Sequence, residues 1–339
     1  MLTVVAVIVV FGLLIFIHEL GHFLVAKRAG ILVHEFALGF GPRLAGIRRG
    51  ETEYTLRAVP LGGFVRFAGM DPKEEEYDPA RSYRYKSVRQ RMGVIAAGPL
   101  ANFFLAIVLL AVIFMVQGLP TPTTVVKTVL PDRPAAAAGL QQGDRIVAVD
   151  GRQVGNWEQL VTEISTRPGE TLILTVEREG ERLDLPVVPE NESGVGKIGF
   201  APDIQPVRVG LFKALAGGVQ YTVQITLLIV SFLGQMITGH APADVGGPVR
   251  IVAEIGTAAQ LGLMPLLQLA AFLSINVGLF NLLPIPALDG SRLMFLSWEG
   301  LTRRPVNPER EGMFHLVGFA LLLLLIVVIT YNDIAQLMM

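Results

Sequence analysis

Apolar residues along this chain of 339 residues gather into four long blocks in which polar residues are rare. Each block approaches the roughly 20 residues that an α-helix needs to cross a bilayer. The pattern predicts a polytopic α-helical membrane protein with four transmembrane helices, at 1–26, 94–116, 262–290 and 313–331. The first block has no basic leading segment and no clear cleavage site, so we expect it to be retained rather than removed as a signal peptide.

A fifth apolar stretch, from Phe212 to Ile237, has a weaker pattern. Its strongly apolar part, residues 225–233, is short, and glutamine and threonine side chains flank it. Such a segment suits a helix that lies in the membrane interface better than one that crosses the bilayer. We predict an interfacial, amphipathic helix within 205–240, with a fifth span as the alternative.

The composition supports a membrane protein. Hydrophobic residues make up 52% of the chain and charged residues only 17%, whereas soluble domains carry about 25% charged residues. This excludes a disordered chain and an ordinary soluble enzyme with one core. The net charge of −1 gives no basic footprint for nucleic acid. Because the chain has no cysteine, it has neither disulfides nor thiolate metal ligands.

Lysine and arginine set the predicted orientation, because positively charged loops remain on the cytoplasmic side. The segment 27–93 is rich in both residues, and the short link before the fourth span holds Arg292, Arg303, Arg304 and Arg310. Both should be cytoplasmic. The N-terminus, the large segment after Val116 and the C-terminal tail are then extracytoplasmic.

Two segments between the spans have strand character. In 27–93 the apolar strands 33–40 and 54–59 adjoin a membrane helix, which predicts a β-rich loop that re-enters the membrane as a hairpin. Residues 120–190 contain short alternating strands with Asp-Gly turn signals. The sequence from Pro134 to Gly151 resembles a bacterial PDZ domain, a module that binds extended chains at a sheet edge. We predict one inserted α+β PDZ domain at 120–190; a β-rich domain without a ligand is the alternative.

The candidate chemistry begins with the motif His18-Glu19-Leu20-Gly21-His22. Residues four apart lie on one face of a helix, so both imidazoles can reach one metal ion, and Glu19 can take a proton from water on that ion. Ionisable residues at the end of a transmembrane run are costly and usually functional. The motif therefore predicts a metal site.

A catalytic zinc site usually has three protein ligands, so a third must come from elsewhere in the chain. Asp289 follows the third span, where Pro284 and Pro286 break the helix and expose backbone carbonyls. We predict Asp289 as the third ligand. His315 is the competing candidate, and a packed or hydrogen-bonded histidine is its alternative interpretation.

These motifs together resemble the site-2 protease family of intramembrane zinc metalloproteases. The resemblance rests on the histidine motif in the first span and on the segment from Asn281 to Gly290, which reads NxxPxxxLDG. It extends to Gly39-Phe40-Gly41-Pro42, Pro60-Leu61-Gly62-Gly63, Gly98-Pro99-Leu100-Ala101-Asn102 and the single PDZ domain. The chain is most similar to the bacterial branch that cleaves anti-sigma factors, some members of which have two PDZ domains.

The resemblance implies that Zn²⁺ is held by His18, His22 and Asp289, with Glu19 as the general base. It implies that Asn281 holds the substrate or stabilises the oxyanion. Residues expected near the substrate are Asn102, Gly39, Gly41, Gly62 and Gly63. Hydrogen bonding between helices is the alternative role for both asparagines, and Gly98 is expected to allow close helix packing.

The resemblance also implies regulated intramembrane proteolysis in the bacterial inner membrane. The substrate would be a single-span membrane protein, such as an anti-sigma factor or a signal-peptide remnant, that another protease has first cut outside. The lipid bilayer and a peptide ligand of the PDZ domain are the other expected partners. That domain either binds a newly formed carboxyl terminus or excludes bulky ectodomains.

Two other functions compete with proteolysis. The chain could be a non-catalytic membrane adaptor with a PDZ domain, or a metal transporter whose ligands pass an ion onward. Glu19 favours the protease, because only that function needs a proton-transfer group beside the metal.

Overall fold

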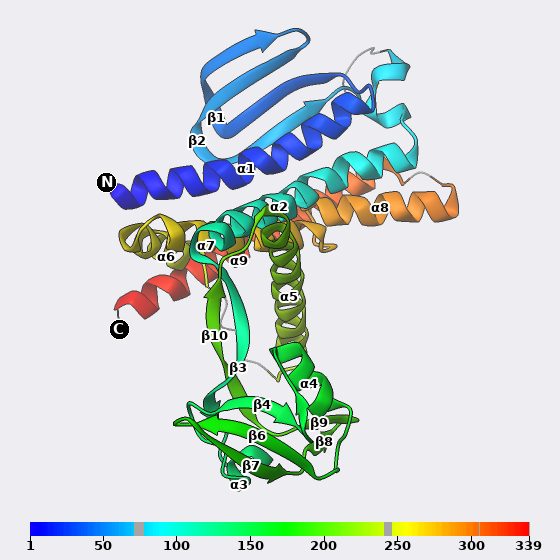
Figure 1. Cartoon of the computed structure of the whole chain (residues 1–339). Coiled ribbons are helices and arrows are strands. Elements are labelled where there is room, and N and C mark those ends of the chain that lie inside the picture. Colours follow the sequence, from blue (N-terminus) through cyan, green and yellow to red (C-terminus); the bar gives the residue numbers. More distant parts are fainter. Residues whose placement is uncertain (71–77, 241–245, 305, 339) are drawn as a thin grey trace. The chain divides into compact units, whose positions relative to one another are not determined.

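The computed structural model describes residues 1–70, 78–240, 246–304 and 306–338. The chain divides into two compact units (Figure 1). Unit 1 comprises Met1–Ile113 and Leu211–Met339, and unit 2 comprises Phe114–Gly210. The division follows the sequence pattern, since the long apolar blocks lie mainly in unit 1 and the alternating strands mainly in unit 2.

Long helices form most of unit 1. They are α1 (Leu2–Arg28), α2 (Val88–Gln117), α5 (Leu211–Ile237), α6 (Pro248–Leu261), α7 (Leu263–Leu282), α8 (Asp289–Thr302) and α9 (Pro308–Met338). Among the described residues, five helices are long and apolar enough to cross a membrane, namely α1, α2, α5, α7 and α9. The chain is thus a multi-pass membrane protein. The predicted count of four spans stays a prediction, because length and composition also admit α5.

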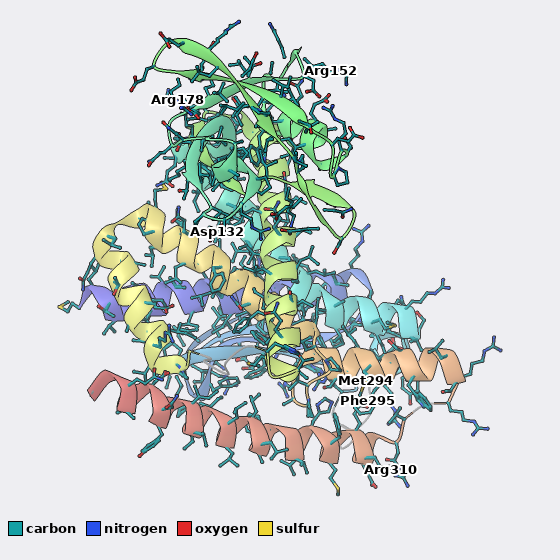
Figure 2. The ribbon with its side chains drawn as sticks, turned by 90° about the horizontal axis from the view of Figure 1, so that it is seen from below. Asp132, Arg152, Arg178, Met294, Phe295 and Arg310 are labelled. Atoms are coloured by element: carbon teal, nitrogen blue, oxygen red, sulfur yellow. The ribbon has the colours of Figure 1, made fainter. Side chains whose placement is uncertain are left out.

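Helix α5 differs from the other long helices in its direction. In both views α1 and α2 run along one direction, and α5 runs crosswise to them (Figure 1 and Figure 2). The backbone of α5 packs closely on α2 through Gly218, where a Cβ atom would lie 2.8 Å from the carbonyl oxygen of Ile107. Helix α6, which the sequence analysis did not predict, contacts α1, α7 and α9.

Strands β1 (Val33–Arg49) and β2 (Thr52–Phe67) form a sheet whose register folds back on itself. Ala37 is paired both with Phe64 and with Thr55. Residues 33–38 therefore lie between 63–67 and 53–56, and 43–49 pairs with 52–57 beyond them. Short helical turns η1 (Pro79–Arg81) and η2 (Tyr83–Tyr85) follow. Sequence predicted the strands but not this register, because alternation identifies a face and not a partner.

Unit 2 is a six-stranded antiparallel sheet with two helices and a small hairpin. Its strands are β3 (Leu119–Val129), β4 (Arg145–Val149), β5 (Arg152–Gln153), β6 (Leu172–Arg178), β7 (Glu181–Val187) and β10 (Phe200–Val207), and the hairpin is β8 (Glu190–Glu192) with β9 (Val195–Lys197). Helix α3 (Pro134–Ala137) precedes β4, and α4 (Trp157–Ser165) packs its Leu160 and Ile164 into the core. The order is β10-β3-β4-β6-β7, with β5 beside β4. Because β10 pairs with β3, unit 2 extends beyond the predicted boundary at residue 190.

Unit 2 contains an ion pair between Asp144, which is buried just before β4, and Arg178 at the end of β6. Arg178 Nε lies 2.7 Å from Asp144 Oδ1, and the backbone N–H of Gln141 donates to Oδ2 over 2.8 Å. Burial alone would raise the pKa of Asp144, but these hydrogen bonds hold it below the ordinary value. A carboxylate with a lowered pKa stabilises the fold above its unfolded pKa, and the stabilisation is lost as the pH falls.

We therefore expect Asp144→Asn to lower the free energy of unfolding of unit 2 by about 2 kcal/mol at neutral pH. The loss should shrink as the pH falls below about 4, where the carboxylate of the unfolded chain takes up its proton, and should vanish below the lowered pKa of the folded state. Urea unfolding followed by Trp157 fluorescence measures it in a Trp298→Phe background, which leaves one tryptophan, in α4. The exposed Asp184→Asn is the matched control, and an equal effect of both variants would contradict the prediction.

Candidate metal centre

Helix α1 carries two histidines on one face. His18 and His22 are four residues apart, and both side chains are buried, together with Leu14 and Ala26 on the same face. The side chain of His18 is 11% exposed and that of His22 is 9% exposed. This is the helical spacing that the sequence predicted, and it points both imidazoles towards the interior of unit 1.

The loop after α7 delivers a carboxylate to the same place. Helix α7 ends at Leu282, the segment with Pro284 and Pro286 follows, and α8 begins at Asp289. The turn is tight, because a Cβ atom on Gly290 would lie 2.1 Å from the carbonyl oxygen of Leu283. Asp289 therefore follows a tight turn between two helices.

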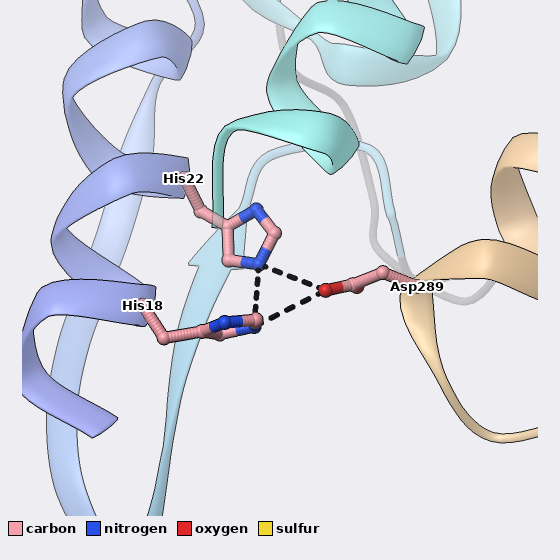
Figure 3. A group of neighbouring side chains, drawn as sticks. All are labelled: His18, His22 and Asp289. Atoms are coloured by element: carbon pink, nitrogen blue, oxygen red, sulfur yellow. Dashed lines mark hydrogen bonds and ion pairs between the residues drawn. The ribbon is translucent and has the colours of Figure 1, made fainter. Parts of the chain in front are cut away.

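The three donor atoms converge on one point (Figure 3). His18 Nε2 lies 3.1 Å from Asp289 Oδ2, His22 Nε2 lies 3.3 Å from the same oxygen, and the two nitrogens are 3.2 Å apart. Tetrahedral zinc has ligand bonds of about 2.0–2.2 Å, which puts neighbouring ligand atoms about 3.3 Å apart. The donor set and its spacing therefore fit a zinc ion, with a fourth position left for water.

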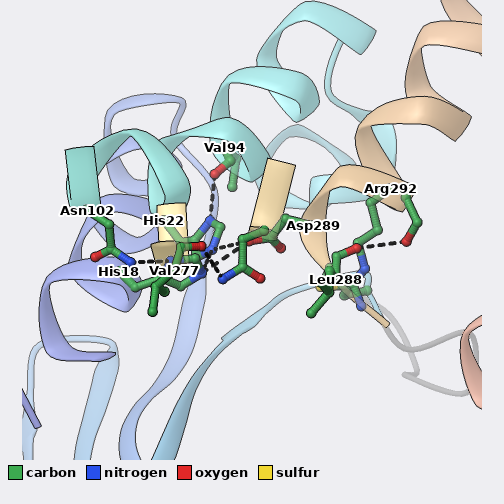
Figure 4. A network of polar contacts seen from close by, with 11 residues as sticks. His18, His22, Val94, Asn102, Val277, Leu288, Asp289 and Arg292 are labelled. Atoms are coloured by element: carbon green, nitrogen blue, oxygen red, sulfur yellow. Dashed lines mark hydrogen bonds and ion pairs between the residues drawn. The ribbon is translucent and has the colours of Figure 1, made fainter. Parts of the chain in front are cut away.

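The other ring nitrogens of both histidines are also engaged (Figure 4). His22 Nδ1 lies 2.8 Å from the carbonyl oxygen of Val94 on α2, so it donates its proton there and leaves Nε2 as a lone-pair donor. The Asn102 amide lies 3.3 Å from His18 Nδ1. Ligand histidines in metal sites are oriented by such partners. Among described residues, His18, His22 and Asp289 are the group that can hold a metal ion.

Asn102 lies behind His18. Its side chain is completely buried, and its backbone carbonyl accepts a hydrogen bond from Ser274 Oγ over 2.7 Å. The amide oxygen Oδ1 has no hydrogen-bond partner among the residues that the structure describes. Turned about its last bond, the same amide would offer that oxygen to an N–H at His18 Nδ1. Asn102, which was predicted to lie near the substrate, contacts a candidate metal ligand in the structure.

Glu19 follows His18 on α1 and is within electrostatic range of His18, His22 and Asp289. The sheet of β1 and β2 approaches Glu19 closely at Gly63. A Cβ atom at that position would lie 3.0 Å from Glu19 Cγ and 2.9 Å from Ile15 Cγ2. The glycine therefore lets the backbone of β2 pass beside the predicted general base.

Glycines also bring α1 and α2 together at the metal centre. A Cβ atom on Gly98 would lie 2.2 Å from His22 Nε2, and one on Gly21 would lie 2.3 Å from the carbonyl oxygen of Ala97. Both distances are shorter than any ordinary contact of a Cβ atom. The helices cross where neither carries a side chain, and the His22 ring fills the space above Gly98.

The remaining predicted residues are not members of this group. The Asn281 amide donates to the Val277 carbonyl over 2.9 Å, one turn back on α7. Gly39, Gly41 and Gly62 have positive φ angles of 92°, 81° and 129° in the sheet of β1 and β2. His315 on α9 contacts Ala287 and is outside the group of candidate ligands.

Two histidines and a carboxylate around one point, beside a second carboxylate on an apolar helix, are the arrangement of a membrane-embedded metallopeptidase. Comparison with known proteins agrees. The family model described as Peptidase family M50 matches residues 6–325. The zinc metalloprotease RasP of Geobacillus kaustophilus is 37% identical, covering 98% of each chain. The regulator of sigma-W protease RasP of Bacillus subtilis is 34% identical, covering 99% of each chain.

The chain therefore belongs to peptidase family M50, a family of zinc metalloproteases, and the predicted membership of the site-2 proteases is confirmed. It is an enzyme, so a non-catalytic adaptor and a transporter are no longer candidate functions. A solved structure of the PDZ domain of an SdrC-like protein from Listeria innocua is similar to 24% of this chain and 92% of that one, with 22% identity and a TM-score of 0.22.

Proposed function

We propose that this intramembrane protease binds its zinc ion through His18, His22 and Asp289 and uses Glu19 as general base. The observation that carries the proposal is the convergence of three donor atoms within 3.1–3.3 Å of one another. Val94 and Asn102 engage the remaining ring nitrogens and would fix the two imidazoles for that role.

In such a site zinc acts as a Lewis acid and makes water a nucleophile at neutral pH. The Glu19 carboxylate accepts the proton from the attacking water and passes it to the nitrogen of the leaving amine. Asn281 is the second-last residue of α7, just before the loop that leads to Asp289. Its amide has a second N–H besides the one that it donates to the Val277 carbonyl. We propose that this second N–H donates a hydrogen bond to the developing oxyanion, a role worth about 3 kcal/mol.

The substrate class follows from the sheet beside Glu19. A transmembrane helix hides its peptide bonds in backbone hydrogen bonds, so it must unwind before cleavage. Among the residues that the structure describes, 63–67 pair with 33–38 and with no second strand, which leaves a sheet edge beside Glu19. An unwound segment adds there as a further strand. The Bacillus subtilis relative is named a regulator of a sigma factor, and we propose anti-sigma-like, single-span proteins as substrates here.

The metal centre also bears on the membrane topology. His18 and His22 lie in the C-terminal half of α1, and Asp289 follows the C-terminal end of α7, so α1 and α7 must end on the same side. Helix α2 returns the chain across the bilayer once. A single crossing by α5 would bring Asp289 to the wrong side, and α6, with 14 residues, is too short to cross back. The spans are then α1, α2, α7 and α9, with α5 in the interface.

With this topology, arginine and lysine place 27–93 on the cytoplasmic side and unit 2 outside a bacterial inner membrane. Unit 2 has a groove of about 400 Å³ between α4 and residues 195–200, lined by Leu160, Val161 and Ile164. Strand β10 is the end strand of its sheet, and Phe200 at its start lines this groove. We propose that the groove binds an extended peptide, as expected of a PDZ domain.

The zinc content of the purified chain tests the ligand set. We expect wild-type protein to hold one zinc ion and Asp289→Ala to weaken zinc affinity by at least about 100-fold, because removing one of three ligands exceeds the effect of removing an outer partner. Zinc is measured by metal analysis after dialysis against a chelator. Asp203→Ala in unit 2 is the control, and unchanged zinc affinity in Asp289→Ala would exclude this site.

A further inference from the structure

A histidine of α9 holds the loop that carries Asp289. His315 Nδ1 lies 3.1 Å from the backbone nitrogen of Ala287 and accepts its N–H. On the other side of the ring, Nε2 lies 3.7 Å from Glu311 Oε1, one turn earlier on the same helix. The nearby carboxylate favours the proton on Nε2, which leaves the lone pair on Nδ1 for Ala287. The ring is therefore oriented as an acceptor towards the loop.

The same face of α9 receives the loop directly. Gly318 lies three residues after His315, and a Cβ atom there would lie 1.8 Å from Pro286 Cβ. No residue other than glycine allows Pro286 to approach the α9 backbone in this way. His315 and Gly318 together form what we call the loop seat, in which Pro286 and Ala287 rest.

The held segment has an unfavourable backbone conformation. Ala287 has a φ angle of +73°, in the left-handed region that residues other than glycine rarely adopt. Such conformations persist only where surrounding contacts impose them. The contact here is the hydrogen bond to His315, and Ala287 stands two residues before Asp289.

We propose that His315 is a positioning residue that sets the direction of Asp289 in the metal centre by holding Ala287 in its left-handed conformation. Without the acceptor, Ala287 relaxes, and the start of α8 turns the carboxylate away from His18 and His22. The inference rests on the proposed ligand set. It explains why a polar ring is kept in an apolar helix although it is not itself a ligand.

The test measures zinc affinity by competition with a chromophoric chelator, using the full chain in detergent. We expect His315→Leu to weaken zinc binding about tenfold, the lower range for outer partners of metal ligands. His315→Asn should restore most of the affinity, because asparagine Oδ1 occupies the position of Nδ1. His315→Gln should not, because its oxygen lies where Nε2 was. Ala287→Gly should partly rescue His315→Leu, since glycine adopts a positive φ without strain.

His240→Leu is the matched control, because His240 is exposed and bonds to Thr238 within its own turn. Equal zinc affinity in wild type and His315→Leu would overturn the inference while leaving the ligand set intact. Equal weakening by leucine and asparagine would also overturn it, since packing alone would then explain the loss. If Asp289→Ala retains wild-type affinity, the ligand set itself fails, which is a different outcome.

Discussion

Glu19→Gln should abolish cleavage of a single-span substrate while zinc remains bound. Glutamine keeps the size of the side chain but cannot accept a proton, and a positioned general base contributes about 10²–10⁴-fold to the rate. Because His18, His22 and Asp289 are untouched, zinc content should equal that of wild type. The measurement pairs metal analysis with a gel assay of a purified model substrate in detergent.

Glu254→Gln on α6 provides the control for the amide substitution, since Glu254 is exposed and pairs with Arg250 on its own helix. Wild type and this control should cleave equally. Cleavage by Glu19→Gln at the wild-type rate would remove Glu19 from the mechanism. Loss of both zinc and cleavage would instead assign Glu19 a part in holding the metal centre.

The ligands of the candidate site were predictable because each carries a local signal. A four-residue spacing on an apolar run places His18 and His22 on one helix face. Pro284 and Pro286 follow the end of α7 and predict a loop. A carboxylate directly after such a loop, as at Asp289, is therefore a recognisable candidate ligand. Ionisable side chains are rare in such surroundings, so the scarcity of charge directs attention to these three residues.

What sequence could not predict depends on contacts between distant segments. The fold-back register of β1 and β2 pairs Ala37 with two partners, and alternation alone cannot specify that. Strand β10 joins unit 2 through β3, some 80 positions earlier in the chain, so the boundary predicted at 190 left it out. Helix α6 has only moderate apolar character, so its sequence gives a weak signal. Its contacts with α1 and α9 stabilise it in the fold.

Asn102 and His315 show that a motif can indicate which residues lie near a site but not which atoms they contact. Asn102 has the expected proximity to the site, and its buried amide contacts His18 Nδ1. The sequence left two roles open for His315, a metal ligand or a packed histidine. Its actual contact, the N–H of Ala287, is invisible in sequence, because backbone donors are the same at every position but proline.

Gly98→Ala is expected to have a large effect on zinc affinity although Gly98 has no side chain to bind the metal. A methyl group there would stand 2.2 Å from His22 Nε2, and the ring is already fixed by its hydrogen bond to Val94 on the same helix. Either the imidazole leaves the metal centre or α1 and α2 separate. Gly98→Ala should therefore weaken zinc affinity about as much as His22→Ala does, and cleavage should fall with it.

Gly93→Ala on the same helix is the matched control, because its nearest neighbour, Val25 Cγ1, would be 4.0 Å from the new Cβ atom. That variant should keep zinc and activity. Zinc affinity measured for Gly93→Ala, Gly98→Ala and His22→Ala separates a collision at the ring from a general effect of alanine in α2. Wild-type zinc binding in Gly98→Ala would mean that His22 can move aside and still coordinate, which the close crossing of α1 and α2 does not allow.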